Sequence, residues 1–293
     1  MGERVASETT FVTMVRTASE RERARLLIES IRSFGGSLGS CDIWVCDANP
    51  QTVHSKRLER AGVQVLPLTT PHTMERYYFS DKVSACAQAE DLAAGGVGSL
   101  IWIDPACLII KAPVLFELNS AFDVAVRPVH IRNIGLTVSE PLDGFWEKTF
   151  EAVGVRDVQA SVESFVDGQE IRAYYNSHAF AVDPSLRLLQ QWKACFEGLV
   201  LDQGFQKGPC ADELHQIFLH QAVLSALIAT KVETSRTRIL PPDYNYPYNL
   251  HESVPFDKRA STLNELVCVA YEERSLDPSA VADIVIDEPL HSW

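Results

Sequence analysis

The sequence predicts an α/β protein with a doubly wound, mostly parallel central sheet flanked by helices. Between Phe11 and Asp104, short apolar runs alternate with helical patterns, which is the strand–helix order of such sheets. The run Leu100–Ile103 is apolar throughout, as expected for a parallel strand buried on both faces. With 293 residues and a hydrophobic fraction of 46%, the chain is long enough for a sizeable core. We therefore predict one domain over residues 1–293.

The first two elements are a strand and a helix. Phe11–Val15 is a short apolar run, and over residues 19–34 the apolar positions recur at helical spacing. Ser19 and Glu22 stand three positions apart, which predicts a capping box at the start of this helix. Gly35 and Gly36 then predict its end.

The rest of the chain continues the alternation. The elements expected next are strand Ile43–Cys46, helix Val53–Ala61, strand Val63–Leu66, helix Asp81–Ala94, strand Leu100–Ile103 with a second apolar run at Cys107–Ile110, and strand Phe122–Val126. The second half is expected to contain helix Trp146–Val153, strand Ala179–Val182, helix Leu186–Glu197, helix Asp212–Thr230 and strand Leu266–Ala270. The pattern weakens at about 127–171, where we expect an insertion.

Charge and composition exclude several classes of protein. The net charge is −13 and no basic run stands out, which argues against a nucleic-acid phosphate backbone as the main partner. The seven cysteines are scattered without a CxxC pair, so we expect buried thiols in a reducing compartment. Residues 1–10 lack the apolar stretch of a signal peptide, and no apolar run approaches the ~20 residues of a membrane span. These features favour a cytoplasmic protein.

Asp104 is the most informative single residue. It directly follows the apolar run Leu100–Ile103, and ligands of open α/β sheets collect at the carboxyl ends of the strands. A carboxylate there is well placed to meet a metal ion or a ligand hydroxyl. The alternative is that Asp104 only caps a turn before Pro105.

Five features follow one another in a fixed order: strand Val12–Arg16 with a polar turn, Lys82 on the helix before Asp104, Asn176 and His178 at the start of a later strand, His220 and Gln221 on the long helix, and the segment Ile239–Asn245 after it. This order resembles the nucleotide-diphospho-sugar transferases of the GT-A fold, glycosyltransferases built on one Rossmann-like α/β domain. The resemblance covers about Phe11 to Tyr271 and rests on order and spacing.

The resemblance implies a nucleoside-diphosphate sugar as donor and an acceptor that the sequence does not identify. Thr13 and Arg16 on the first strand would contact the nucleotide, and Asp47 would contact its base or ribose. Lys82, with Arg16, would offset the charge of the diphosphate, which must be stabilised as it leaves.

On the donor-sugar side, the resemblance places Asn176 and Asp212, and His178 and Gln221 are expected among the substrate-binding residues. If the reaction inverts the anomeric configuration, Asp212 or Glu213 would accept the proton of the acceptor.

A divalent cation is also implied, and Mn²⁺ or Mg²⁺ suits oxygen ligands. Asp104 corresponds to the first aspartate of the Asp-x-Asp motif, and His251 is the histidine nearest the expected late metal ligand. The second aspartate is replaced by Ala106, and the segment Val267–Glu273 contains no histidine. Metal dependence therefore stays open.

Two other readings of the chain remain. The same departures favour a non-catalytic relative that binds a nucleotide sugar or a protein partner without transfer. A nucleotidyltransferase that makes sugar nucleotides would need a glycine-rich loop after the first strand, where Thr17, Ala18 and Ser19 stand instead. The donor base, the sugar, the stereochemical outcome and the oligomeric state are not fixed by the sequence.

Overall fold

The computed structural model describes residues 8–93, 95–277, 279 and 284–293. Its centre is a seven-stranded sheet with the order β10-β6-β9-β4-β1-β2-β3, in which only β9 runs against the other strands. The strands of this sheet are β1 (Glu8–Val15), β2 (Asp42–Asp47), β3 (Gln64–Pro67), β4 (Val97–Ile103), β6 (Val124–Val126), β9 (Ala179–Val182) and β10 (Thr237–Ile239). The predicted α/β fold with a mostly parallel central sheet is confirmed.

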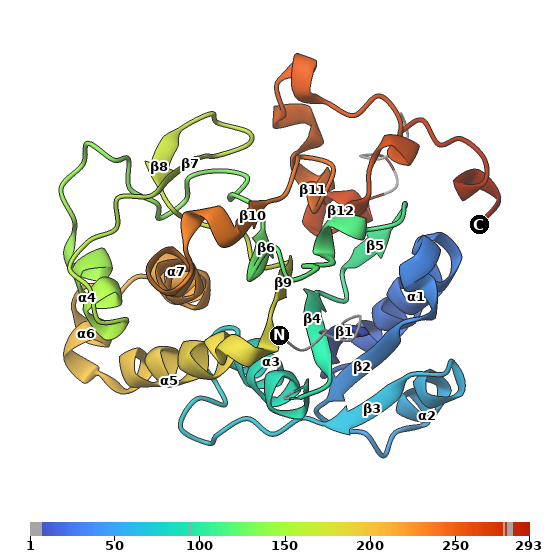
Figure 1. Cartoon of the computed structure of the whole chain (residues 1–293), viewed down its shortest axis with the longest axis horizontal. Helices are drawn as coiled ribbons and strands as arrows, with labels where there is room; N and C mark the ends of the chain where they lie inside the picture. The colour runs from blue at the N-terminus through green and yellow to red at the C-terminus, as the bar shows by residue number, and fades with distance from the viewer. Residues whose placement is uncertain (1–7, 94, 278, 280–283) are drawn as a thin grey trace, which may run out of the picture.

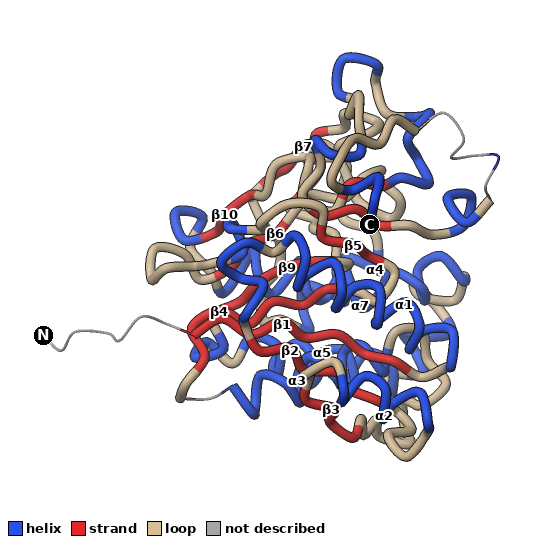
Figure 2. The backbone as a smooth tube through the Cα atoms, turned by 90° about the vertical axis from the view of Figure 1, so that its right-hand side faces the viewer, coloured by secondary structure: helices blue, strands red, loops and turns tan. Residues whose placement is uncertain are grey.

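Helices cover both faces of the sheet (Figures 1 and 2). The helices are α1 (Ala18–Phe34), α2 (Val53–Arg60), α3 (Ser80–Ala93), α4 (Gly144–Ala152), α5 (Leu188–Leu201), α6 (Gln203–Lys207) and α7 (Glu213–Lys231). One hydrophobic core lies between the sheet and α1, and a larger core lies between the opposite face and α3, α5 and α7. The sheet is thus the middle of three layers.

Alternation along β1 supplies both cores. Phe11 and Val15 pack in the core that contains the apolar face of α1, whereas Val12 and Met14 pack in the core that contains α3. Successive side chains of a strand point to opposite faces, so a continuous apolar run is what a doubly covered strand requires. The same reasoning accounts for the apolar run that ends before Asp104.

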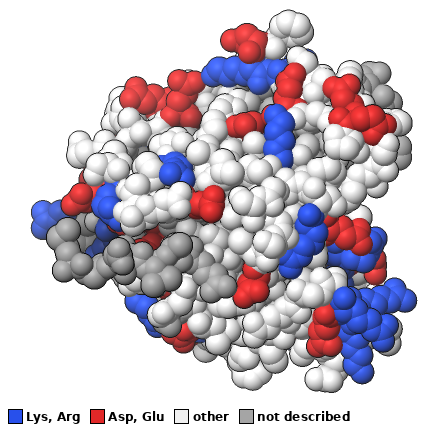
Figure 3. Space-filling model, turned by 45° about the vertical axis from the view of Figure 1, so that its right-hand side comes forward, with Lys and Arg blue, Asp and Glu red and all other residues white. Residues whose placement is uncertain are grey.

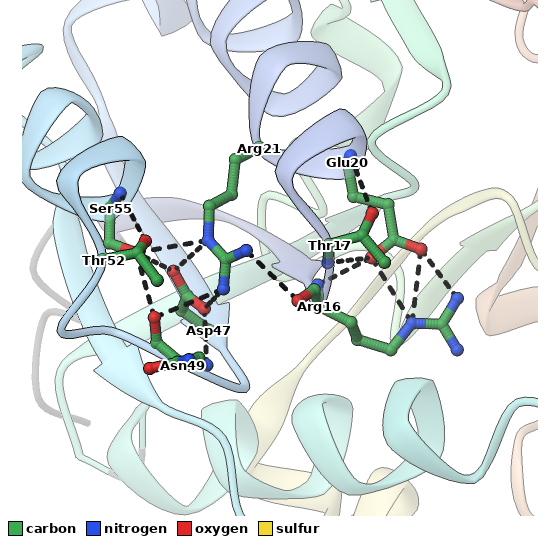
Figure 4. Close-up of polar contacts among 8 residues, drawn as sticks. All are labelled: Arg16, Thr17, Glu20, Arg21, Asp47, Asn49, Thr52 and Ser55. Carbon is green, nitrogen blue, oxygen red and sulfur yellow. Dashed lines mark hydrogen bonds and ion pairs between the residues drawn. The ribbon is translucent and has the colours of Figure 1, made fainter.

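The start of α1 corrects one prediction. The cap is Thr17 rather than Ser19, and the partner in the capping box is Glu20 rather than Glu22. The Thr17 hydroxyl accepts a hydrogen bond from the Glu20 amide at 3.2 Å, and the Glu20 carboxylate accepts from the Thr17 amide at 3.3 Å (Figure 4). The Arg16 side chain also donates to Glu20 at 2.7 Å, and this ion pair favours the earlier start.

The start of α5 is set by a residue distant in sequence. The helix begins at Leu188 rather than at the predicted Leu186, after Arg187 in a left-handed conformation with φ of 55°. The buried Glu90 carboxylate accepts from the amides of Leu189 at 3.0 Å and Gln190 at 2.8 Å. Amides in a first helical turn need such acceptors, and here α3 supplies one. The predicted end of α3, Ala94, lies outside the described residues.

Two smaller sheets complete the fold. Strands β11 (Tyr246–Pro247), β12 (Cys268–Ala270) and β5 (Cys107–Ile109) form one, and β7 (Ser161–Glu163) and β8 (Glu170–Arg172) form the other. The apolar run after Asp104 therefore joins a different sheet from the run before it. The weakly patterned region at 127–171 contains α4, which packs on α7 in the larger core, and the β7–β8 hairpin.

The described part of the chain contains no helix long and apolar enough to cross a membrane. On the face shown in Figure 3, basic side chains lie beside acidic ones rather than in a broad basic area. Five cysteines are buried, as predicted for thiols within apolar runs: Cys46, Cys86, Cys107, Cys210 and Cys268.

Candidate functional site

The candidate site lies at the carboxyl ends of β1 and β4. These strands are neighbours, and the helices α1 and α3 associated with them cover opposite faces of the sheet. Open α/β sheets bind ligands at such a switch in topology. Arg16 follows β1 and Asp104 follows β4, so both stand at this edge.

Three adjoining pockets open at this edge. The first, which we call the basic pocket, has a volume of ≈ 210 Å³ and is lined by Met14, Arg16, Glu20, Arg23, Phe79, Lys82, Asp104, Pro105, Ala106 and Glu272. Arg16 and Phe79 also line a second pocket, and Glu272 also lines a third. The three pockets are therefore neighbours, with the basic pocket in the middle.

Lys82 forms the back of the basic pocket. The residue is only 3% exposed, and its ammonium donates to Asp104 Oδ2 at 2.9 Å and to Ser177 Oγ at 3.2 Å. The rings of Phe79 and Trp102 lie 5.8 and 5.6 Å from its Nζ atom. An ammonium has three N–H donors, and within the described residues two of them are used.

Asp104 is held from both sides. Trp102 Nε1 donates to its Oδ1 atom at 2.8 Å, while Lys82 donates to Oδ2. Its backbone amide donates to the carbonyl of His178 at 2.8 Å, next to the pairing of β4 with β9. Asp104 and Lys82, both predicted as site residues, are thus brought together at one point of the cleft.

A second network fixes the direction of the bonds around Ser177. Nδ1 of His220 lies 2.9 Å from the carbonyl of Ile217, so it carries the proton, and burial holds the pKa of His220 well below its usual value. The unprotonated Nε2 atom then accepts from the Ser177 hydroxyl at 3.0 Å. The lone pairs of Ser177 Oγ remain to accept from Lys82.

His178 lies between two carboxylates. Its Nε2 atom is 3.1 Å from Glu272 Oε1 and 3.9 Å from Asp104 Oδ2, and its Nδ1 atom is 2.9 Å from Asn176 Oδ1. Burial alone would lower the pKa of His178, but the hydrogen bond and charge of Glu272, with the charge of Asp104, outweigh it and raise the pKa. Both ring nitrogens therefore face hydrogen-bond acceptors, as suits the protonated ring.

The second pocket, the aromatic pocket, has a volume of ≈ 310 Å³ and is lined by Arg16, Glu75, Arg76, Tyr77, Tyr78, Phe79 and Asp81. Tyr78 and Phe79 are each 40% exposed. Phe79 has a φ of 59°, and its ring stacks on His220 at 4.1 Å. A bulky residue in this left-handed region is strained, and such strain collects at functional sites.

The third pocket, the amide pocket, has a volume of ≈ 260 Å³. Its polar lining is rich in side-chain amides, and the rest of the lining is largely apolar. The full lining is Val129, His130, Ile131, Asn133, Asn176, His178, Phe218, Gln221, Pro247, Asn249, Leu250, Ala270 and Glu272. The orientation of the Asn176 amide is fixed, because its oxygen accepts from the His178 amide at 2.8 Å and from Asn245 Nδ2 at 2.7 Å. Asn176, His178 and Gln221, all predicted as substrate-binding residues, line this pocket.

Asp47 is fully buried and bonded on every side (Figure 4). Its carboxylate receives both the Nε and Nη2 groups of Arg21, the hydroxyl of Ser55 at 2.6 Å and the amide of Asn49 at 2.8 Å. Burial by itself would raise the pKa of Asp47, but these bonds outweigh it and lower the pKa. The structure gives Asp47 a role in joining β2, α1 and α2, and its nucleotide contact stays a prediction.

The other predicted residues lie outside the three pockets. Thr13 is buried on β1. Asp212 caps α7 and bonds to His215, and Glu213 accepts from the hydroxyl of Tyr78 at 2.7 Å. His251 stands 2.8 Å from the Tyr246 hydroxyl and stacks on Tyr248 at 5.2 Å; its contacts do not include Asp104.

A divalent cation does not fit the residues as they are arranged. Both oxygens of Asp104 already accept hydrogen bonds, and the neighbouring position in the pocket is Ala106. Across residues 8–93, 95–277, 279 and 284–293, no three His, Cys, Asp or Glu side chains form a group that could hold a metal ion. We therefore derive no step through a metal.

Sequence reasoning missed Glu272, Phe79 and Ser177. Glu272 follows the short strand β12, which pairs with β5 rather than with the central sheet, so no strand-end pattern placed it beside Asp104. Phe79 carries its signal in a backbone angle that the sequence does not show. Ser177 stands between two predicted residues, Asn176 and His178.

Comparison with known proteins supports the fold. No family model matches the chain, and no curated protein matches it. The apo structure of the WbbM bifunctional glycosyltransferase aligns with 93% of this chain at a TM-score of 0.55 and 14% identity, and the chain spans 47% of that protein. The apo form of mouse xyloside xylosyltransferase 1 aligns with 90% of this chain and 97% of its own at a TM-score of 0.47 and 12% identity. The likeness to the WbbM structure shows that the chain has an α/β fold similar to that of a glycosyltransferase, with a mostly parallel sheet flanked by helices.

Proposed function

We propose that this protein transfers a sugar from a nucleoside-diphosphate donor to an acceptor hydroxyl. One observation carries the proposal: three adjoining pockets of different chemistry lie in a row at the carboxyl edge of the sheet. A sugar nucleotide has three parts of matching chemistry, namely a flat base with its ribose, a charged diphosphate and a neutral sugar. The fold supports the same reading.

The aromatic pocket suits the base. Tyr78 and Phe79 present exposed rings there, and aromatic faces stack on bases with a gain of about 1–3 kcal/mol per base. Arg16, which also borders the basic pocket, stands where the ribose would join the diphosphate.

The basic pocket suits the diphosphate. Lys82, Arg16 and Arg23 line it, and cations aimed at a departing phosphate stabilise the charge that develops as the sugar–oxygen bond breaks. Lys82 is fixed in place by Asp104 and Ser177, so little reorganisation is needed during reaction.

The amide pocket suits the sugar. Side-chain amides offer both donors and acceptors to hydroxyls, and Phe218 and Leu250 offer apolar contact to the C–H faces of a ring. The acceptor would approach from this side. Glu213, predicted with Asp212 as a proton acceptor for an inverting reaction, instead lies beside the aromatic pocket, where it accepts from the Tyr78 hydroxyl, so that role stays a prediction.

A second candidate function is binding of a sugar nucleotide without transfer. It is favoured by the arrangement around Asp104, whose carboxylate is fully engaged and whose neighbour is Ala106. Transfer and binding alone differ in whether the nucleoside diphosphate is released.

A thermal-shift panel of sugar nucleotides tests the proposal. A ligand at 100 times its Kd stabilises the folded state by about 2.7 kcal/mol, which is roughly 5–10 °C in Tm for a chain of this size. We expect one sugar nucleotide to raise Tm, and Lys82→Gln to reduce the shift to about a third. Lys56→Gln, an exposed lysine on α2, is the matched control.

Release of the nucleoside diphosphate from the best ligand, with water or candidate sugars as acceptor, then separates transfer from binding alone. Absence of any shift across the panel would contradict both candidate functions.

A further inference from the structure

We infer that the diphosphate of the donor is bound directly by the Lys82 ammonium, without a divalent cation between it and Asp104. This inference rests on the proposed function. In it, Asp104 is a positioning residue that holds the ammonium in the basic pocket.

The placement of Lys82 suits direct contact with a diphosphate. Two of its donors are engaged with Asp104 and Ser177 inside the described residues, and the ammonium lines the basic pocket, so the third donor is available to a ligand there. The neighbouring rings of Phe79 and Trp102 leave the buried side chain little freedom. The positive charge is therefore already in position before a ligand binds.

The carboxylate of Asp104 is poorly suited to hold a metal ion. A hard cation needs carboxylate oxygens as ligands. Here Oδ1 is occupied by Trp102 Nε1 at 2.8 Å and Oδ2 by Lys82 Nζ at 2.9 Å. A metal at Oδ2 would have to displace a buried ammonium and stand close to its charge, which is unfavourable at this separation.

The side chains around Asp104 offer a metal ion few ligands. Position 106 offers the methyl group of an alanine, and the carboxylate of Glu272 is bonded to His178. Arg16 and Arg23 are the other cations of the pocket, and both stand on the side of β1 and α1. The lining also carries the carboxylates of Glu20, Asp104 and Glu272, which are paired with Arg16, Lys82 and His178. A diphosphate would therefore meet these cations as positioned N–H donors rather than as an excess of positive charge.

Isothermal titration calorimetry tests the inference with a panel of probes: UDP, GDP, ADP, CDP and dTDP, each with EDTA and each with Mn²⁺. We expect the nucleotide that binds to have a Kd in EDTA within about threefold of its Kd in Mn²⁺. Lys82→Gln should weaken binding in EDTA by about 30-fold, the size of one lost hydrogen bond to a charged group. Lys56→Gln should leave the Kd unchanged.

Asp104→Asn sharpens the test. Its amide oxygen still accepts from Lys82, so we expect a loss of affinity smaller than that of Lys82→Gln, whereas a metal ligand would lose most of its function. Binding that requires Mn²⁺ would overturn this inference and leave the proposed function standing. Absence of binding in both buffers would overturn both. If a variant does not fold, the wild-type Kd in EDTA compared with that in Mn²⁺ is enough to test the inference.

Discussion

The Asp47 carboxylate offers a way to separate a structural role from a ligand contact. We predict that Asp47→Asn strongly destabilises the protein and affects nucleotide affinity only through this loss of folding stability. The carboxylate is fully buried, Arg21 is 4% exposed, and four hydrogen bonds converge on Asp47 (Figure 4). An asparagine leaves one oxygen for these donors and leaves the Arg21 charge without its counter-ion.

The expected magnitude follows from that geometry. Removing one partner of a buried ion pair costs about 3–5 kcal/mol, because the other charge stays buried. At about 2–4 °C per kcal/mol for a large domain, this is a fall in Tm of roughly 10 °C. The matched control is Asp42→Asn, the same substitution at the exposed start of β2, which should change stability by less than about 0.5 kcal/mol.

Urea unfolding at several pH values measures the effect. The pKa of Asp47 is lowered in the folded state. Its contribution to the free energy of unfolding is therefore present above the unfolded pKa and is lost as the pH falls through the folded pKa. The difference in free energy of unfolding between wild type and Asp47→Asn should therefore become smaller at acid pH. A variant as stable as Asp42→Asn that binds nucleotide weakly would refute the structural role and favour the predicted ligand contact.

Three further predictions concern Glu90, Phe79 and Glu272. Glu90→Gln should cost about 1–3 kcal/mol in urea unfolding, since one amide at the start of α5 loses its acceptor. Because burial raises the pKa of Glu90, its contribution to the free energy of unfolding is complete below the unfolded pKa and declines as the pH rises through the folded value. The variant should lack this dependence of stability on pH. Phe79→Gly should stay within about 1 kcal/mol of wild type, because relief of the left-handed backbone offsets the lost ring contacts. Its nucleotide affinity should fall in calorimetry, and unchanged affinity would exclude Phe79 from the base pocket. Glu272→Gln should lower the pKa of His178 in an NMR titration, because the carboxylate that raises it is gone; an unchanged value would contradict the pairing.

The sequence indicated the central sheet because its strands are buried on both faces and therefore apolar without interruption, as in Leu100–Ile103. It also named Asp104 and Lys82 as site residues, and the structure brings their side chains together, since a strand-end carboxylate and a lysine on the preceding crossover helix converge at the same edge.

The features that the sequence did not predict depend on contacts between residues far apart in the chain. Glu90 caps a helix about a hundred positions away, and Glu272 enters the cleft from a strand of a separate sheet. Asp47 was predicted as a ligand contact from its place at a strand end, but the sequence does not show that Arg21 folds over it.

The most direct test of the account is a crystal structure with the sugar nucleotide that gives the largest thermal shift. We expect a diphosphate oxygen within hydrogen-bond distance of Lys82 Nζ, the base against Tyr78 and Phe79, and the sugar among the amides of Asn176 and Gln221. A ligand bound elsewhere, or one whose diphosphate reaches Asp104 only through a metal ion, would contradict this expectation.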